Sequence, residues 1–258
     1  GMYETINNVD LKFILPRLVQ RSARLVYVAE KNTLALKANN LIHKARLVRI
    51  ENALPVVEFQ SLCRSNLGLP ERAFVLTLVS RAMEEKGWQE AIDIVTAARS
   101  ISGADIHLLL VGDGPEYDRL RDLELPAYIH LEGFQRNVRG YFAVADAGFL
   151  PSKFRGESFP LVIIECLQAG RPFLASNLGD IAYMLGTPQG AAGILVDLDG
   201  ARIDVQGWAD KVHALASDRN AYEVLRSRVS AAAQKFDSAS MAKKYDEMYR
   251  SSLRGADE

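Results

Sequence analysis

Short apolar runs alternate along most of the chain with segments whose apolar residues recur every three or four positions. Apolar runs of about four to eight residues are typical of strands, whereas the wider spacing is typical of one face of a helix. We predict helices at residues 11–20, 31–40, 87–100, 116–122 and 161–169. We predict strands at residues 25–29, 45–50, 74–79, 105–112, 128–133, 146–151, 172–176 and 192–196.

This alternation predicts an α/β fold built on a doubly wound, parallel, Rossmann-like sheet, because strands joined through helices by short connections lie parallel. The run at residues 105–112 is apolar at nearly every position, as a strand requires when helices cover both faces of its sheet. Beyond the last strand, the pattern predicts two or three amphipathic C-terminal helices with turns near Ser217 and Asp237. We expect three parts, at residues 1–60, 61–204 and 205–258.

The composition is that of a globular chain, because 48% of the 258 residues are hydrophobic and 24% are charged. Lysine and arginine number 31 against 32 aspartates and glutamates, which argues against a nucleic-acid-binding protein, since such domains are usually basic. Cys63 and Cys166 are too few for a disulfide framework, and we expect Cys166, within VIIECLQAG, to be buried. The first residues lack a signal-peptide pattern, so we expect a cytoplasmic protein.

The loop after the predicted strand at residues 74–79 carries two cations, Arg81 and Lys86, five positions apart. Ligands of parallel sheets bind where the strands end, and a guanidinium with an ammonium on one loop suits a diphosphate. Considered alone, the pair fits two solvated loop cations better. Gly112 and Gly114 follow the next buried strand and allow a ligand to approach closely. The pattern lacks the third glycine of a dinucleotide site and the Lys-Ser/Thr pair of a Walker loop.

The segment PSKFRGESFPLVIIECLQAGRP is the most informative, because it joins the end of a strand to a helix that begins near Pro160. The amides of Phe159 and Leu161 at the helix start can point at a phosphate. Glu157 precedes the helix, where it could also act as a partner of the helix dipole. Glu165 lies in the apolar run VIIECL, and it is a candidate functional residue because burying a carboxylate without a partner is costly. One carboxylate could meet a sugar ring and the other a ribose.

Other polar residues give weaker signals. Gly179 follows a predicted strand, and we expect Asp180 to cap the next helix. The four histidines are dispersed without the spacing of a metal site, so no metal ligands are predicted. His107 and His130 fall inside strand patterns, and we expect them in the core or at a sheet edge.

Five segments, in their order along the chain, resemble the donor-nucleotide domain of the GT-B glycosyltransferases of family 4, also called group 1. They are SRAMEEKG, VGDGP, LEGFQRNV, LPSKFRGESFPLVIIECLQAGRP and ASNLGDI, and the resemblance covers about residues 47–197. Its most specific part is the pair of glutamates eight positions apart in the fourth segment. Ser80 stands where the family usually has glycine, Cys166 where it has alanine, and Tyr183 where an acidic residue is common.

The resemblance implies roles for individual residues. Arg81 and Lys86 would hold the diphosphate of a UDP- or GDP-linked sugar. Glu165 would accept hydrogen bonds from the ribose hydroxyls, and Glu157 would face the transferred sugar. No metal or other cofactor is needed in the family. The other implied donor contacts are the backbone of Ser158, Phe159, Pro160 and Leu161 and, beside the nucleoside, Gly112, Gly133 and Arg136.

The resemblance also implies a function, the retaining transfer of a sugar from a nucleotide-diphosphate sugar to a sugar or lipid-linked acceptor. Residues 1–60 resemble the tail of an N-terminal domain with its crossover, and the family places most acceptor contacts in an earlier part of that domain. We expect that earlier part to be missing from the chain, which leaves open a module that binds the donor without turnover. A contact with a membrane surface also stays open, whereas nucleic acid is not expected as a partner.

Overall fold

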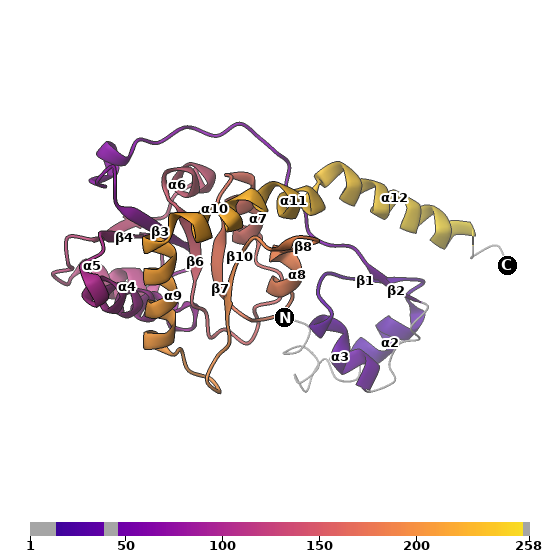
Figure 1. Ribbon diagram of the computed structural model, residues 1–258. Helices are drawn as coiled ribbons and strands as arrows, with labels where there is room; N and C mark the ends of the chain where they lie inside the picture. Colours follow the sequence, from indigo (N-terminus) through magenta and orange to yellow (C-terminus); the bar gives the residue numbers. More distant parts are fainter. Residues whose placement is uncertain (1–13, 39–45, 255–258) are drawn as a thin grey trace.

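The computed structural model describes residues 14–38 and 46–254. Its centre is a six-stranded parallel sheet in the order β10-β7-β6-β3-β4-β5 (Figure 1). All six strands overlap runs predicted from the sequence, and the doubly wound α/β fold is confirmed. The strands are β3 (Phe74–Val79), β4 (Ile106–Val111), β5 (Ile129–Gly133), β6 (Ala147–Leu150), β7 (Phe173–Ser176) and β10 (Gly193–Val196).

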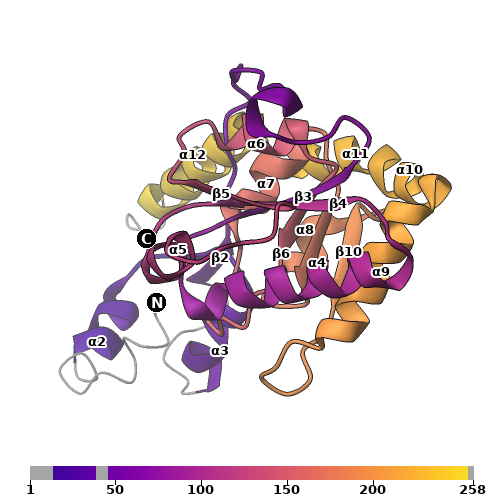
Figure 2. The ribbon, with the colours of Figure 1, turned by 90° about the vertical axis from the view of Figure 1, so that its left-hand side faces the viewer.

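Helices cover both faces of this sheet and form two hydrophobic cores (Figures 1 and 2). Alternate residues of β4 face opposite cores: Leu109 and Val111 pack on one side, and Leu108 and Leu110 on the other. This two-sided burial explains why the β4 run is apolar at every position except His107. One face is covered by α6 (Val138–Val144), α7 (Leu161–Gln168), α8 (Ile181–Leu185) and α11 (Val229–Ala233), and the other by α4 (Trp88–Ser102), α5 (Pro115–Arg121) and α9 (Val205–Ser217).

The C-terminal part differs from its prediction in the number of helices. The turns near Ser217 and Asp237 are confirmed, but residues 205–254, all of them described, form four α-helices rather than two or three. The additional boundary, between the helices at residues 219–227 and 229–233, falls at Arg228. The Arg228 backbone keeps a right-handed helical conformation, so the chain needs neither glycine nor proline there, and the sequence gives no sign of the boundary. The further elements are α10 (Arg219–Ser227), a 3₁₀ turn (Gln234–Phe236) and α12 (Ser238–Arg254).

A short helix and a hairpin of the sheet domain were among the elements absent from the prediction. Helix α6 has seven residues, and Gly140 in its interior lowers the helix propensity that a sequence pattern can detect. Its stability comes from packing, because Tyr141, Phe142 and Val144 are buried in the core. The second is an antiparallel hairpin of β8 (Gly186–Thr187) and β9 (Gly190–Ala191).

A second, two-stranded parallel sheet belongs to what we call the N-terminal segment, the described residues 14–38 and 46–50. In Figure 1 this segment lies below α12, to the right of the large sheet. The predicted strands at residues 25–29 and 45–50 are confirmed where they are described; residues 11–13, 39–40 and 45 of the predicted elements lie outside the described residues. The elements are α2 (Ile14–Arg21), β1 (Leu25–Tyr27), α3 (Lys31–Ala38) and β2 (Leu47–Arg49).

A long linker, residues 51–73, joins the N-terminal segment to β3, and the last helix extends above that segment (Figure 1). Leu54 of the linker and Asp237, just before α12, pair side by side in an isolated parallel β-bridge. Farther along the linker, the Arg64 guanidinium pairs with the Asp146 carboxylate at 2.9 Å beside the start of β6. The same guanidinium donates to the Ala73 carbonyl at 2.9 Å before β3. The linker is therefore fixed to the amino ends of the central strands.

His107 and His130 form a hydrogen-bonded pair, which confirms their predicted places in the core and at the sheet edge. His107 lies buried on β4, and His130 lies on the edge strand β5. The His107 Nδ1 and His130 Nε2 atoms are 2.9 Å apart, and His107 Nε2 lies 3.1 Å from Asp105 Oδ1. Burial lowers the pKa of both imidazoles, and the neighbouring ring lowers that of His130 further. The fold therefore favours two neutral rings.

We expect this pair to make the stability of the protein depend on pH. Because the folded-state pKa values lie below the ordinary value of 6.5, the unfolded chain binds more protons as the pH falls through that value. The free energy of unfolding should therefore be lower at about pH 5.5 than at about pH 7.5, as measured by urea denaturation. The double variant His107→Gln/His130→Gln should reduce this difference. An undiminished difference in the double variant would contradict the assignment.

Candidate functional site

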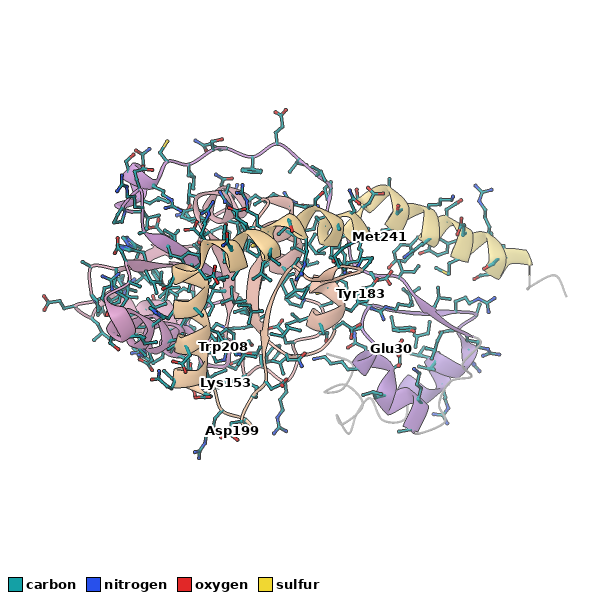
Figure 3. The ribbon with its side chains drawn as sticks, viewed as in Figure 1. Glu30, Lys153, Tyr183, Asp199, Trp208 and Met241 are labelled. Carbon is teal, nitrogen blue, oxygen red and sulfur yellow. The ribbon has the colours of Figure 1, made fainter. Side chains whose placement is uncertain are left out.

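The strand order changes direction between β3 and β6, and the loops that follow these strands meet at that point. Ligands of open α/β sheets bind in the crevice at such a switch point, beyond the carboxyl ends of the strands. The loop after β3 carries Arg81 and Lys86, and the loop after β6 carries Glu157. The Lys153 amide donates to the Glu85 carbonyl at 2.8 Å and joins the two loops; Figure 3 labels Lys153 at this end of the sheet.

Two glycines allow these loops to touch through their backbones. Gly87 has φ +77°, and a Cβ atom there would lie 1.9 Å from the Pro151 carbonyl oxygen. Gly112 has φ +143°, and its Cβ atom would lie 1.9 Å from the Ser80 carbonyl oxygen. Only glycine combines this backbone conformation with so close an approach. The Gly112 amide also donates to the Gly133 carbonyl at 2.8 Å, which brings together two residues predicted to face a nucleoside.

Lys86 and Glu157 form a nearly buried ion pair, with 2.7 Å between Nζ and Oε2 and side-chain exposures of 12% and 8%. The Ser152 hydroxyl donates to the same carboxylate oxygen at 3.3 Å, and the Lys86 ammonium lies 4.6 Å from the centre of the Phe154 ring. Buried charges are tolerated only when they are paired and hydrogen-bonded, and these contacts meet that need. Lys86 is thus not the solvated loop cation that its sequence spacing alone favoured.

The start of α7 presents free backbone amides beside this pair. The helix begins at Leu161 after Pro160, as predicted, and the Pro160 nitrogen has no hydrogen to donate. Within the described residues, the amides of Ser158, Phe159 and Leu161 donate to no acceptor. The Phe159 ring is buried and packs edge-on against Phe236, with ring centres 5.7 Å apart, which holds this stretch of backbone in place. Such unpaired amides at a helix start favour an anion.

Glu165 is half-buried on α7, in the second turn of the helix. Its carboxylate accepts no hydrogen bond from any residue that the structure describes. Burial raises the pKa of Glu165, and the positive charge of Arg139 opposes this rise. The sequence indicated such an acid, half-buried and without a hydrogen-bond partner. The two carboxylate oxygens of Glu165 are therefore available as acceptors for a ligand.

Three other predicted site residues are exposed, namely Arg81, Arg136 and Leu161. Neither guanidinium forms an ion pair or hydrogen bond with the described part of the chain. Both follow carboxyl ends of strands, β3 for Arg81 and β5 for Arg136. The two arginines are therefore free to bind an anion, although no contact joins either one to Lys86 or Glu157.

Asp180 occupies the N-cap position of α8, as predicted, but its side chain does not cap the helix. Its carboxylate makes no capping bond, and its Oδ2 atom instead pairs with Arg49 Nη2 at 2.8 Å and accepts from the Glu30 amide at 3.4 Å. The Asp180 amide donates to the Ser158 carbonyl at 2.9 Å. The Arg49 guanidinium of β2 competes with the first backbone amides of the five-residue helix α8 for the Asp180 carboxylate. The charge-assisted bond to Arg49 is the stronger of the two interactions.

Sequence reasoning missed two residues of the N-terminal segment that reach this site. The Lys31 ammonium donates to the Arg155 carbonyl at 3.1 Å, and the Ser158 hydroxyl donates to the Asn32 side-chain oxygen at 3.1 Å. Figure 3 labels the neighbouring residue, Glu30. No motif marks these residues, which lie more than 120 positions before their partners. The signal that could have found them is their place in the first turn of a predicted helix that directly follows a predicted strand, and so at the carboxyl end of that strand.

The described residues also contain a cavity of about 530 Å³ at the far end of α7, between that helix, α11 and the linker. It is lined by Gln168, Val229 and Phe236 among others and includes none of the predicted site residues. In the described ranges, no three His, Cys, Asp or Glu side chains gather as a metal ion would require, and no helix is long and apolar enough to cross a bilayer. The switch point therefore remains the candidate site.

Solved structures with the same fold include that of Anabaena Alr3699/HepE in complex with UDP-glucose, at 20% identity and a TM-score of 0.77. The match covers 94% of this chain and 68% of that one. Sucrose-phosphate synthase from Thermosynechococcus elongatus matches with a TM-score of 0.72 and 20% identity, over 96% of this chain and 63% of that one. At these identities the likeness establishes the fold, in agreement with the predicted GT-B architecture.

Two curated relatives are 27–28% identical. N-acetyl-alpha-D-glucosaminyl L-malate synthase of Bacillus anthracis matches at 28% over 74% of this chain and 49% of its own length. The lipopolysaccharide core biosynthesis glycosyltransferase LpsD of Rhizobium meliloti matches at 27% over 85% and 62%. The chain thus spans about half to three fifths of these relatives. Residues 73–218, more than half of the chain, match the family model of the group 1 glycosyl transferases, and the chain belongs to that family.

Proposed function

We propose that the chain takes part in the transfer of a sugar from a nucleotide-diphosphate donor to a sugar or lipid-linked acceptor, with retention of the anomeric configuration. The observation that supports this most is the convergence of Lys86, Glu157 and the free amides before α7 at the switch point of the sheet. These groups suit a diphosphate and the hydroxyls of a sugar. A structure with the same fold holds UDP-glucose, which favours the same class of ligand here.

In this proposal the diphosphate is bound by charge and by backbone amides. Lys86 and the exposed Arg81 supply cations from the loop after β3, and the amides of Phe159 and Leu161 supply donors from the start of α7. When the bond to the sugar breaks, negative charge grows on the departing diphosphate. Donors that are already in place stabilise such charge without the cost of reorganisation, and this is the main contribution we assign to the site.

The two glutamates divide the remaining contacts. Glu165, with its unpaired carboxylate, is assigned to the ribose hydroxyls, and Gly112, Gly133 and Arg136 are assigned to the nucleoside. Glu157 is assigned to the hydroxyls of the transferred sugar. In the absence of a donor, Glu157 and Lys86 neutralise each other. A nucleotide sugar offers phosphate oxygens to the lysine and hydroxyls to the glutamate, so it can replace both halves of this ion pair at once.

The reaction that we propose exchanges one bond at the anomeric carbon. The bond between this carbon and the diphosphate oxygen breaks, and a bond to the acceptor oxygen forms on the same face of the sugar. The acceptor hydroxyl transfers its proton to the departing diphosphate, which becomes the free nucleoside diphosphate. In this scheme the leaving group assists the acceptor, so neither a metal ion nor another cofactor takes part.

A second candidate is a module that binds the nucleotide sugar without transferring it. The observation in its favour is that the chain matches only 49% of the length of the Bacillus anthracis relative. Binding of UDP-glucose, detected by calorimetry, together with the absence of transfer to any acceptor would support this candidate. Hydrolysis or transfer of the sugar by the same preparation would support the first one.

A cytoplasmic location is part of the proposal. Both cysteines are free, with Cys63 exposed and Cys166 buried. Burial raises the pKa of the Cys166 thiol, so it stays protonated and unreactive. Free cysteines fit a reducing compartment.

We expect the chain to bind UDP- or GDP-linked sugars in the absence of divalent metal. The donors that we assign to the diphosphate are Arg81, Lys86 and backbone amides, so a chelator removes none of them. Isothermal titration of UDP-glucose and GDP-mannose, with EDTA and with added Mg²⁺, should give the same dissociation constant for whichever donor binds. Loss of binding in EDTA would count against the proposed site.

We also expect variants to separate the diphosphate contact from the sugar contact. Charge-assisted hydrogen bonds contribute about 1.5–3 kcal/mol, so Arg81→Ala should weaken UDP and UDP-glucose alike, by roughly ten- to a hundredfold. Arg219→Ala, which removes an exposed arginine on α10, is the matched control. Glu157→Gln should weaken UDP-glucose without weakening UDP. If Glu157→Gln weakens UDP as much as Arg81→Ala does, Glu157 acts as a scaffold for its loop and not as a sugar contact.

A further inference from the structure

Lys31 is the first residue of α3, and its side chain extends from the N-terminal segment to the loop that carries Glu157. The Lys31 ammonium is half-buried and donates to the Arg155 carbonyl at 3.1 Å. An ammonium has three N–H groups, and within the described residues the Arg155 carbonyl is the acceptor for one of them. Lys31 therefore brings a partly dehydrated cation with unused donors to the edge of the proposed donor site.

The charges around Lys31 are those of the site itself. Burial lowers the pKa of Lys31, the negative charges of Glu157 and Asp180 raise it, and the positive charge of Lys86 lowers it. Both carboxylates already have closer partners, because Glu157 pairs with Lys86 and Asp180 pairs with Arg49. Lys31 is thus a cation whose neighbouring carboxylates are paired with other side chains. This arrangement leaves an excess of positive charge that an anionic ligand would balance.

The backbone next to Lys31 is fixed to the sheet domain on both sides of this residue. The Glu30 amide donates to the Asp180 carboxylate at 3.4 Å, and the Asn32 side-chain oxygen accepts from the Ser158 hydroxyl at 3.1 Å. Because residues 30 and 32 are both anchored, the root of the Lys31 side chain is held against the loop before α7. An anchored lysine loses less conformational entropy when it binds a ligand than a lysine that is free in solvent.

We propose that Lys31 is an additional cationic contact of the donor diphosphate, supplied by the N-terminal segment. This inference rests on the donor site proposed above. The ligand of Lys31 is the distal phosphate, the one that carries the sugar. The reason is the contact of Lys31 with Arg155, two residues before Glu157, the residue that we assign to the sugar. Arg81 and Lys86 approach the diphosphate from the sheet domain, and Lys31 approaches it from the N-terminal segment.

This assignment also explains the balance of charges. A nucleotide sugar carries one negative charge on each of its two phosphates. Arg81, Lys86 and Lys31 bring three positive charges, and Glu157 brings one negative charge, which leaves an excess of two positive charges to match them. Without Lys31, the excess would neutralise only one phosphate. In this assignment the N-terminal segment contributes a side chain, Lys31, to the donor site.

The test compares nucleotides with and without the distal phosphate. Dissociation constants of UMP, UDP and UDP-glucose (or the guanine nucleotides, if GDP binds more tightly) are measured by calorimetry for the full chain and for Lys31→Met. Lys37→Met is the matched control, because Lys37 lies on the same helix and pairs with Glu30, away from the loop. Lys31→Arg keeps the charge and serves as the rescue variant. Circular dichroism and melting curves establish that each variant is folded.

We expect Lys31→Met to weaken UDP and UDP-glucose by about tenfold or more and to leave UMP unchanged. Lys31→Arg should restore most of the affinity, and Lys37→Met should behave like the parent chain. Equal affinities of Lys31→Met and the parent for UDP, or an equal loss for UMP and UDP, would overturn the assignment, because Lys31 would then serve only the structure of the loop. If the parent chain binds none of these nucleotides, the proposed function fails and the role of Lys31 with it.

Discussion

The ion pair between Lys86 and Glu157 is the constraint on which the site depends. Its members come from loops after β3 and β6, so the pair closes the switch point of the sheet. Both side chains are nearly buried, and removing the partner of a buried charge costs more than the pair itself contributes. A ligand that displaced only the lysine would leave the carboxylate without compensation. The site therefore favours ligands that carry an anion and hydroxyl donors on neighbouring atoms.

The sequence predicted the sheet well, because the physical cause of each strand is local. Five of the six residues of β4 are apolar since its two faces meet separate cores, and Gly87 precedes α4 because the backbone of Pro151 approaches it. The prediction failed where tertiary contacts override local preference. Helix α6 contains Gly140 and is held by packing, and Asp180 gives up a capping role for a guanidinium from the distant strand β2.

The candidate site was predictable only in part, for a related reason. Lys86 and Glu157 lie in loops after strand ends in one continuous domain, so topology alone brings them to one edge. Lys31 reaches the same edge from helix α3 of the N-terminal segment, and nothing in its local sequence indicates how the two sheets are placed. That placement depends on side chains scattered over the chain, among them Arg49 and Asp180.

Tyr183 shows how one such contact accommodates a departure from the family pattern, which commonly has an acidic residue here. The Arg49 guanidinium lies 4.4 Å from the centre of the Tyr183 ring, and the Tyr183 hydroxyl donates to Glu51 at 3.2 Å (Figure 3 labels Tyr183). The aromatic face attracts the cation, and Asp180 and Glu51 supply the negative charge. The interface between the two sheets thus keeps a stabilised arginine without an acid at this position.

The backbone contacts at Gly87 and Gly112 have a consequence for how this site can diversify. Both positions exclude every side chain because a carbonyl oxygen occupies the place of Cβ, whatever donor is bound. The exposed side chain of Leu161, by contrast, meets no such restriction. In the site that we propose, sequence drift, or a library designed to change the sugar that is accepted, can therefore vary exposed positions such as Leu161 while Gly87 and Gly112 stay unaltered. Selectivity and phosphate binding would then be separable traits of the proposed site.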